Sequence, residues 1–312
     1  MSAPADITFL FGCTGCGKAA VGLEAARRCG AEIISVDSMK IYRGMDVGTA
    51  KPSSAVRAQV PHHLIDIVDP WEEFSVAQYV AAADAALEDI RARGRTALAV
   101  GGTPLYIKAF TEGLFEGPSA DPIIRARLQA RAAAEGTEAL HQELAQIDAP
   151  AAERIHPHDL RRIVRALEVY ELTGTPISVL QTQWEALASG GRRYRCRFIG
   201  LRRELDDQNQ RTNARVRRMI EHGLLDEVRR LTHVPRPLSR AARQAVGYAE
   251  ILEHFAGRCS LDEAIERIKI NTRQLAKSQR TWFKRFRTVR WIDVAPGDTV
   301  ERVADEVLQA MQ

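Results

Sequence analysis

Short apolar runs alternate with amphipathic, alanine-rich stretches in the first third of the chain. Residues 7–11, 32–36 and 96–100 are rich in β-branched, aromatic and aliphatic side chains, which is typical of buried strands. The stretch between the second and third runs predicts a helix from Ser75 to Arg93, with Ser75 as its N-cap. Strand, helix and strand in this order predict an α/β fold with a parallel sheet covered by helices on both faces.

The pattern changes after about residue 113. Helical patterns follow, one of them starting at Asp121, and no strand pattern returns until residues 194–199. Further helices then extend to Phe286, and the residues around Trp291 predict a last strand. The predicted division is an α/β core with a basic helical region over residues 1–112 and 195–312, and a helical insertion over residues 113–194.

Length and composition favour one water-soluble enzyme. A chain of 312 residues with 45% hydrophobic content can bury a full core. No apolar run approaches the eighteen residues or so that a membrane span needs. Five cysteines, an odd number in a chain of this length, argue against a disulfide framework and favour a reducing compartment. We expect a cytoplasmic protein without a membrane partner, and nothing in the sequence suggests more than a monomer.

The positive charge is concentrated in one region. Residues 192–290 contain 25 Lys and Arg against 11 Asp and Glu, whereas the whole chain has a net charge of only +4. A segment with this imbalance repels itself unless a polyanion neutralises it. Nucleic acid is therefore the favoured partner, with a solvated basic surface as the alternative.

A glycine-rich turn directly follows the first apolar run. It reads Gly12-Cys13-Thr14-Gly15-Cys16-Gly17-Lys18 and leads into an alanine-rich helix. In a G-x-x-x-x-G-K loop between a strand and a helix, backbone N–H groups, the helix N-terminus and the lysine converge on a phosphate. The turn predicts a P-loop-type sheet that binds a phosphorylated molecule. Ala19 stands where a Ser or Thr hydroxyl normally binds magnesium.

Three loops are expected to meet at one edge of the sheet. The phosphate loop, Asp37-Ser38 and Gly101-Gly102-Thr103 each follow a predicted strand. The carboxyl ends of parallel strands lie at the same edge, where ligands of α/β proteins bind.

Asp37 has two interpretations that the residues alone leave open. Its carboxylate would project into the crevice opposite the phosphate loop, as a general base must. Alternatively, it caps the short turn that it begins, which is a frequent role for Asp.

The basic region ends in a helix with cations on one face. Arg273, Lys277, Arg280, Lys284 and Arg287 are spaced by four, three, four and three residues. Such a face suits a phosphate backbone. The neighbouring Trp282, Phe283 and Phe286 are expected to pack against the core instead of stacking on bases.

Several segments together resemble the bacterial tRNA dimethylallyltransferase family, also called tRNA isopentenyltransferases or IPP transferases. The resemblance rests on residues 36–52, 61–66, 101–106 and 165–169, and continues through residues 244–248 and 272–277. It covers nearly the whole chain, and its motifs occur in the family's order.

The resemblance implies an activity. A dimethylallyl group would pass from dimethylallyl diphosphate to the exocyclic amine of the adenosine 3′ to the anticodon, in tRNAs that read codons beginning with U. Diphosphate would be released, and Mg²⁺ would be the cofactor. The helical insertion would grip the anticodon arm. Because a stacked base cannot reach such a pocket, the adenosine would flip out.

The resemblance also implies roles for individual residues. Asp37, Thr103 and Arg125 would be catalytic, with Asp37 as general base. The diphosphate would be bound by Gly12, Cys13, Thr14, Gly15, Cys16, Gly17, Lys18, Ala19 and Arg215. The tRNA would contact Asp37, Ser38, Met39 and Lys40; Arg161, Arg162, Ile163, Val164 and Arg165; Gln244, Ala245, Val246, Gly247, Tyr248 and Ala249; and Arg273, Lys277 and Arg280. Magnesium would be held by Thr14, Asp37 or water.

The phosphate loop departs from the family's usual Gly-Pro-Thr-Ala-Ser-Gly-Lys-Ser/Thr. Cys13, Gly15, Cys16 and Ala19 differ from it, so two hydroxyls are missing from the diphosphate site. Lys40 stands in place of the usual Gln. Thr14, Lys18 and the backbone N–H groups remain, so we expect binding to persist.

Three other functions remain possible on the residues alone. A P-loop kinase or NTPase would explain the glycine-rich turn, but it predicts a hydroxyl at residue 19. A non-catalytic RNA-binding protein would explain the basic region, but it leaves Asp37 and Thr103 without a role. A transferase that acts on free adenine nucleotides shares the chemistry, but it has less need of a long basic region.

Overall fold

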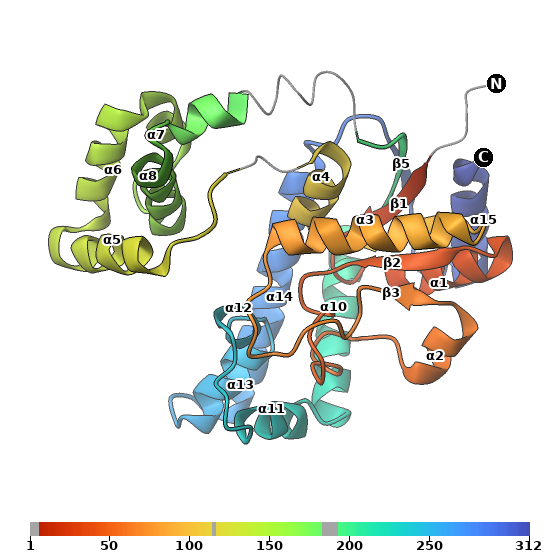
Figure 1. Cartoon of the computed structure of the whole chain (residues 1–312). Helices are drawn as coiled ribbons and strands as arrows, with labels where there is room; N and C mark the ends of the chain where they lie inside the picture. Colours follow the sequence, from red (N-terminus) through yellow and green to blue (C-terminus); the bar gives the residue numbers. More distant parts are fainter. Residues whose placement is uncertain (1–5, 114–116, 183–192) are drawn as a thin grey trace. The chain divides into compact units, whose positions relative to one another are not determined.

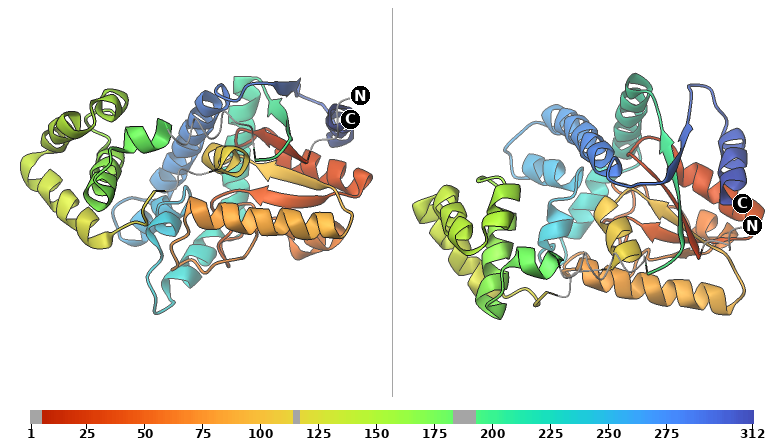
Figure 2. Two further views of the ribbon diagram at one scale, coloured as in Figure 1. Left: turned by 45° about the horizontal axis from the view of Figure 1, so that its top comes forward. Right: turned by 90° about the horizontal axis from the view of Figure 1, so that it is seen from above.

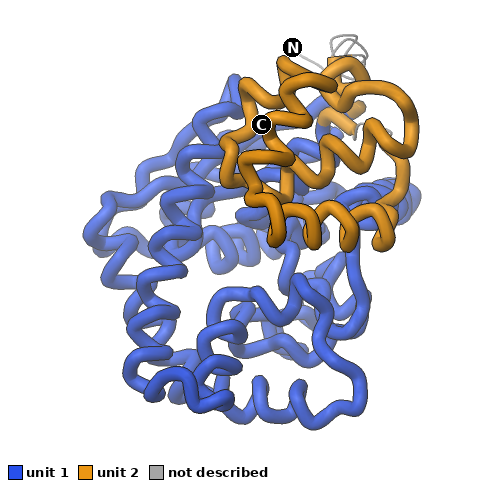
Figure 3. The backbone as a smooth tube through the Cα atoms, turned by 90° about the vertical axis from the view of Figure 1, so that its left-hand side faces the viewer, with its two compact units in different colours: residues 1–111, 194–312 blue, residues 112–193 orange. Residues whose placement is uncertain are grey.

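The computed structural model describes residues 6–113, 117–182 and 193–312 (Figure 1). The chain forms two compact units (Figure 3). Unit 1 comprises residues 1–111 and 194–312, and unit 2 comprises residues 112–193. Unit 2 is thus an insertion in the sequence of unit 1, with bounds that lie one residue from those predicted.

A six-stranded parallel sheet forms the centre of unit 1. Its strand order is β3-β2-β4-β1-β5-β6. The strands are β1 (Ile7–Gly12), β2 (Glu32–Val36), β3 (His62–His63), β4 (Ala97–Gly101), β5 (Cys196–Arg202) and β6 (Val289–Asp293). The α/β prediction is confirmed, and the apolar runs form strands close to their predicted bounds. The pattern missed β3, because two residues are too few to show a period.

Helices cover both faces of this sheet (Figure 2). On one face, Leu10 of β1 and Leu98 of β4 pack with α1 (Lys18–Cys29) and α15 (Val300–Met311). On the other face lie α3 (Val76–Ala92) and α4 (Pro104–Glu112), where Phe9 contacts Phe110 at 5.7 Å between ring centroids. Ser75 caps α3 in a capping box with Gln78, as its sequence predicts.

A second layer of helices in unit 1 follows β5. It consists of α10 (Leu205–Glu221), α11 (Leu224–Thr232), α12 (Arg240–Arg243), α13 (Tyr248–Phe255) and α14 (Leu261–Phe283), while α2 (Ser54–Gln59) lies between β2 and β3. Helices α10 to α14 enclose a core of their own with the segment after β2, through Ile41, Tyr42 and Met45. The helix predicted to reach Phe286 ends at Phe283, so Arg287 lies beyond it. The terminal α15 was not predicted.

Unit 2 is helical in all of its described elements. These are α5 (Pro122–Glu135), α6 (Thr137–Ile147), α7 (Ala149–Arg154) and α8 (Leu160–Thr173). Asp121 caps α5, because its side chain accepts hydrogen bonds from the N–H groups of Ile123 and Ile124. Leu128, Leu140, Leu144 and Leu167 contribute to a separate hydrophobic core. Across both units, no described helix has the length and apolar character that crossing a bilayer requires.

Candidate active site

The glycine-rich turn forms the loop between β1 and α1. Gly15 and Gly17 have φ angles of 88° and 94°, a region that favours glycine. Gly17 directly precedes α1, which begins at Lys18. Cys13 and Cys16 are buried, and all five cysteines are free thiols. Burial raises the pKa of the Cys13 thiol. The loop therefore has the strand, turn and helix arrangement that presents backbone N–H groups and a helix N-terminus to an anion.

Side chains from α10, from α14 and from Arg203 just before α10 hold this loop in place. Gln208 donates to the carbonyl of Thr14 at 2.7 Å, and the N–H of Thr14 donates to Oε1 of Gln279 at 2.8 Å. Arg203 and Arg211 donate to the carbonyls of Cys16 and Gly15 at 3.2 and 3.3 Å. Sequence reasoning missed Gln208, Gln279 and Arg203. No local pattern marks them, because their partners are 187 to 265 residues away.

The loops after β2 and β4 contact each other directly. The N–H of Gly102 donates to the carbonyl of Val36 at 3.1 Å, and the N–H of Ser38 donates to Oγ1 of Thr103 at 3.2 Å. Gly101 is required here, because a Cβ at this position would lie 2.0 Å from the Val36 carbonyl oxygen. Nε2 of Gln279 donates to the carbonyl of Gly102 at 2.6 Å. Gln279 thus joins the phosphate loop to the Thr103 loop, and the three predicted loops meet.

The two carboxylate oxygens of Asp37 differ in their surroundings. Oδ1 accepts hydrogen bonds from the N–H groups of Met39 at 2.9 Å and Lys40 at 3.3 Å, so Asp37 does cap its turn. Among the described residues, none donates to Oδ2. The cap and the general base are therefore compatible, because one oxygen shapes the turn and the other is available to a substrate proton.

Cations surround this carboxylate. Burial lowers the pKa of Lys40 to about 8, against the opposing effect of the Asp37 carboxylate. Burial also lowers the pKa of Arg215, which Asp37 again opposes, and Arg215 lies 3.5 Å from the Thr49 carbonyl. Nζ of Lys18 donates to the Cys13 carbonyl at 3.3 Å. An excess of cations over carboxylates favours a multiply charged anion such as diphosphate.

The oxygen donors for magnesium are few. The side chain of Ala19 is exposed in the first turn of α1 and supplies no ligand. No cluster of three or more His, Cys, Asp or Glu side chains suited to a metal occurs among the described residues. The Thr14 hydroxyl and Oδ2 of Asp37 have no hydrogen-bond partner among the described residues. Because Mg²⁺ takes one or two protein oxygens together with water and phosphate, these two atoms fit such an ion.

The basic helix α14 borders a groove in unit 1. The groove has a volume of about 560 Å³ and is lined by Leu205 and Asn209 of α10 and by Ile270, Arg273, Gln274, Lys277, Arg280, Thr281 and Lys284. Arg273 donates to Oδ1 of Asn213 at 2.9 Å, whereas Lys277 is exposed. Phe283 and Phe286 lie 4.9 and 5.6 Å from Phe11 between ring centroids, so the prediction that they pack against the core is confirmed.

Residues 244–249 contain both exposed and buried side chains. Gln244 is exposed and Val246 and Ala249 are half-buried, but Ala245 and Tyr248 are buried. The hydroxyl of Tyr248 donates to Oε1 of Glu227 at 2.6 Å, and Glu227 also accepts from three backbone N–H groups of residues 46–48. The side chains of Ala245 and Tyr248 therefore pack in the core, and the predicted tRNA contact of residues 244–249 stays a prediction.

The remaining predicted residues belong to unit 2. Arg125 forms a bidentate ion pair with the buried Glu168, at 2.8 and 2.9 Å, and Arg165 donates to the same carboxylate at 2.8 Å. Arg161 and Arg162 are exposed on α8. Ile163 and Val164 are buried in the core of unit 2. These two side chains hold the helices of unit 2 together, and their predicted contact with tRNA stays a prediction.

Known proteins are similar to this chain in sequence and in fold. The IPP transferase family model matches residues 40–286. A tRNA dimethylallyltransferase of Geobacter metallireducens is 48% identical over 282 residues, which cover 90% of each chain. That of Geobacter sulfurreducens is 43% identical over 299 residues, which cover 96% of this chain and 95% of the relative.

A solved structure agrees with these sequence relatives. The full-length tRNA isopentenylpyrophosphate transferase of Bacillus halodurans is 38% identical to this chain and has a TM-score of 0.70. The match covers 98% of this chain and 96% of that one. With the phosphate loop, the Asp37 turn and the family match extending over most of the sequence, this chain belongs to the IPP transferase family.

Proposed function

We propose that this protein transfers a dimethylallyl group from dimethylallyl diphosphate to the exocyclic amine of the adenosine 3′ to the tRNA anticodon. The product is a prenylated tRNA of the class that reads codons beginning with U, and the second product is diphosphate. One observation carries the proposal. The phosphate loop, Asp37 and Thr103 lie at the same edge of one sheet, in a member of the IPP transferase family.

The chemistry requires two kinds of group. An allylic diphosphate ionises readily once its leaving charge is stabilised, and Lys18, Lys40 and Arg215 supply positive charge beside the loop. The exocyclic amine of adenine is a poor nucleophile and must lose a proton as the new C–N bond forms. Oδ2 of Asp37 accepts this proton, while Oδ1 keeps the turn in place. Thr103 holds the Asp37 turn through its bond to Ser38.

Further parts of the proposal concern the partners. The α14 groove, with Arg273, Lys277 and Arg280, binds tRNA phosphates. Unit 2, with Arg161 and Arg162 exposed on α8, grips the anticodon arm. Magnesium would be held by Thr14 and water, because Oδ2 of Asp37 serves as the base, and it would offset charge on the diphosphate. The enzyme acts as a monomer in the cytoplasm.

The deciding experiment incubates the protein with dimethylallyl diphosphate and an unmodified tRNA whose anticodon reads a codon beginning with U. A prenyl mass on the adenosine 3′ to the anticodon supports the proposal. The same incubation with adenosine monophosphate tests a transferase of free nucleotides, and ATP hydrolysis without tRNA tests a kinase or NTPase. A protein that binds tRNA but prenylates neither substrate would be an RNA-binding protein without this activity.

A further inference from the structure

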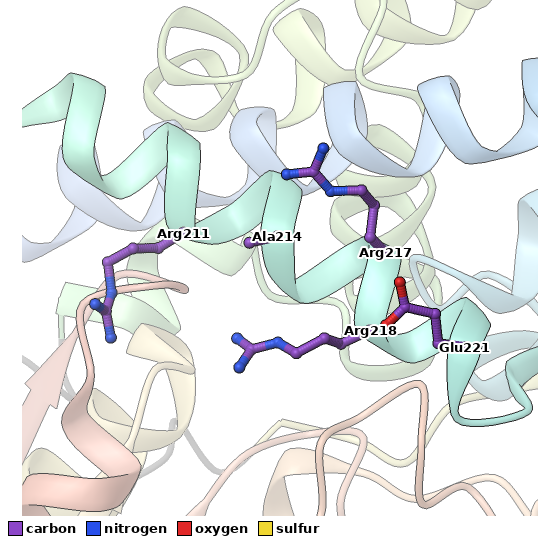
Figure 4. A pocket seen from close by; sticks show the side chains of 5 residues that line it. All are labelled: Arg211, Ala214, Arg217, Arg218 and Glu221. Atoms are coloured by element: carbon purple, nitrogen blue, oxygen red, sulfur yellow. The ribbon is translucent and has the colours of Figure 1, made fainter.

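Helix α10 carries arginines that the proposed chemistry does not use. Arg211 and Arg218 are exposed, and they stand four residues before and three residues after Arg215, which places all three on one side of the helix. Figure 4 shows the side chains of Arg211 and Arg218 extending to the same side of α10, whereas Arg217 extends to the other. A hollow of about 430 Å³ is lined by Arg211, Ala214, Arg217, Arg218 and Glu221.

This line of arginines leads to the phosphate loop. At one end, Nε of Arg211 lies 3.3 Å from the Gly15 carbonyl. In the middle, Arg215 lies 3.5 Å from the Thr49 carbonyl, and the Asp37 carboxylate interacts electrostatically with its guanidinium. Arg218 is the outer member, close enough that its charge adds to the effect of burial on Arg215. The three side chains therefore connect the hollow on the surface with the candidate diphosphate site.

The charges along this line are not neutralised within the protein. Many surface arginines of the chain form ion pairs, among them Arg229 with Asp226 at 2.7 Å on α11. Among the described residues, no Asp or Glu forms an ion pair with Arg211, Arg215 or Arg218. Glu221 lines the hollow but lies more than 4.0 Å from the nitrogen atoms of these arginines. Unpaired cations beside a concave surface raise the local concentration of small anions and speed their capture.

We infer that Arg211 and Arg218 form an entry track that captures the diphosphate of the prenyl donor from solvent and delivers it to the loop. This inference rests on the proposed function for the identity of the donor. The hollow has a volume of about 430 Å³, within the range of small-molecule sites, and Arg211, which lines it, also donates to the Gly15 carbonyl of the phosphate loop. Those two observations favour a free diphosphate over an RNA backbone as the occupant.

The test measures kcat/KM for dimethylallyl diphosphate at saturating tRNA, over a range of salt concentrations. Arg218→Gln is expected to lower kcat/KM about fivefold to tenfold and to flatten its salt dependence, while kcat stays the same, because steering acts on association. Arg218→Lys is expected to keep most of the rate. The matched control is Arg267→Gln, because Arg267 is an exposed arginine of α14 that does not line the hollow. This control is expected to stay within about twofold of the parent.

Two further measurements keep the inference separate from the proposed function. Inorganic diphosphate is titrated into the parent and Arg218→Gln proteins without tRNA, and tRNA affinity is measured for both. Weaker diphosphate binding with unchanged tRNA affinity supports the track, even if the parent prenylates nothing. Three results would overturn it: unchanged diphosphate kinetics and binding, an equal loss in Arg267→Gln, or a loss confined to tRNA affinity, which would assign the surface to RNA.

Discussion

Asp37 performs two tasks with one carboxylate. Oδ1 accepts hydrogen bonds from the N–H groups of Met39 and Lys40. Removing the carboxylate would therefore remove both the turn's hydrogen bonds and the general base. An alanine at this position therefore cannot separate structure from chemistry, but an asparagine can. Its carbonyl oxygen still accepts both hydrogen bonds, while its amide cannot take a proton at neutral pH.

We predict that Asp37→Asn and Asp37→Ala both lower kcat by about a hundredfold or more, because the general base is lost in each. The melting temperature of Asp37→Asn is expected to equal that of the parent, and tRNA affinity is expected to change little. Single-turnover prenylation and thermal unfolding provide the measurements. An Asp37→Asn enzyme with near-parental turnover would leave Asp37 as a turn cap alone.

Gln279 is the residue that joins two loops of the site. Replacing it with Met keeps the volume but removes the bonds to Thr14 and Gly102. We expect KM for dimethylallyl diphosphate to rise about tenfold, since the loop loses an orienting contact. Ser278→Ala, at an exposed neighbouring position, is the control. If Gln279→Met lowers the melting temperature but leaves KM at the parent value, then Gln279 only supports the fold.

A substitution at Ala19 tests whether this position limits magnesium binding. Ala19→Thr restores a hydroxyl in the first turn of α1 without a change in the backbone cradle. We expect the variant to reach half-maximal activity at a lower magnesium concentration than the parent, because it gains an oxygen ligand. Activity as a function of added magnesium is the measurement. Identical curves would mean that the metal is held entirely by other atoms.

At the scale of elements, α14 connects two surfaces. One side of this helix lines the basic groove, and the other side buries Gln279 and Phe283 against the loop and the sheet. The sequence predicted the cations from their spacing, because three-residue and four-residue steps return to one face of a helix. It placed the helix end three residues too far, because Lys284, Arg285 and Phe286 are all compatible with a helix.

Replacing Arg273, Lys277 and Arg280 together with Ala is expected to weaken tRNA binding. Each phosphate contact that is lost should reduce the slope of log affinity against log salt by roughly 0.7 to 0.9. Arg267→Ala is the control, because Arg267 is exposed on α14 but does not line the groove. A slope that stays unchanged in the triple variant would place the RNA surface elsewhere.

At the scale of the whole molecule, each of the two units has a hydrophobic core of its own. Unit 2 also contains a buried, ion-paired carboxylate, Glu168. Burial raises the pKa of this carboxyl, but hydrogen bonds from Arg125, Arg165 and the Asp121 N–H outweigh burial and hold the pKa below its usual 4.5. A depressed carboxyl pKa contributes stability that is present above the unfolded value and is lost as pH falls through the folded value.

We therefore predict that unit 2 loses stability below about pH 4.5, and that Glu168→Gln removes this part of the pH dependence. Amide hydrogen exchange in α5 and α8, compared with the parent at each pH, is the measurement. Glu171→Gln, which affects a more exposed pair with Arg127, is the control. A Glu168→Gln protein whose protection still falls with pH as in the parent would contradict the assignment.

The sequence alone determined those features that depend on neighbours within a few residues. The apolar runs, the Ser75 cap, the helix start at Asp121, the glycine loop and the spacing of Arg273, Lys277 and Arg280 on α14 are all of this kind, and each occurs where it was expected. Their physics is local, because side-chain period, capping hydrogen bonds and positive φ involve one turn or one strand. The family resemblance extended these signals to Asp37, Thr103 and Arg215.

The tertiary structure alone decided which distant side chains support the site and which candidates are buried. Gln208 and Gln279 reach Thr14 across 194 and 265 residues, and the Tyr248 hydroxyl donates to Glu227 of another helix. Such contacts form only when whole helices pack against the sheet edge, and no short pattern encodes them. The physical reason is that a buried polar group must find a partner wherever packing places one, and that partner is set by the fold as a whole.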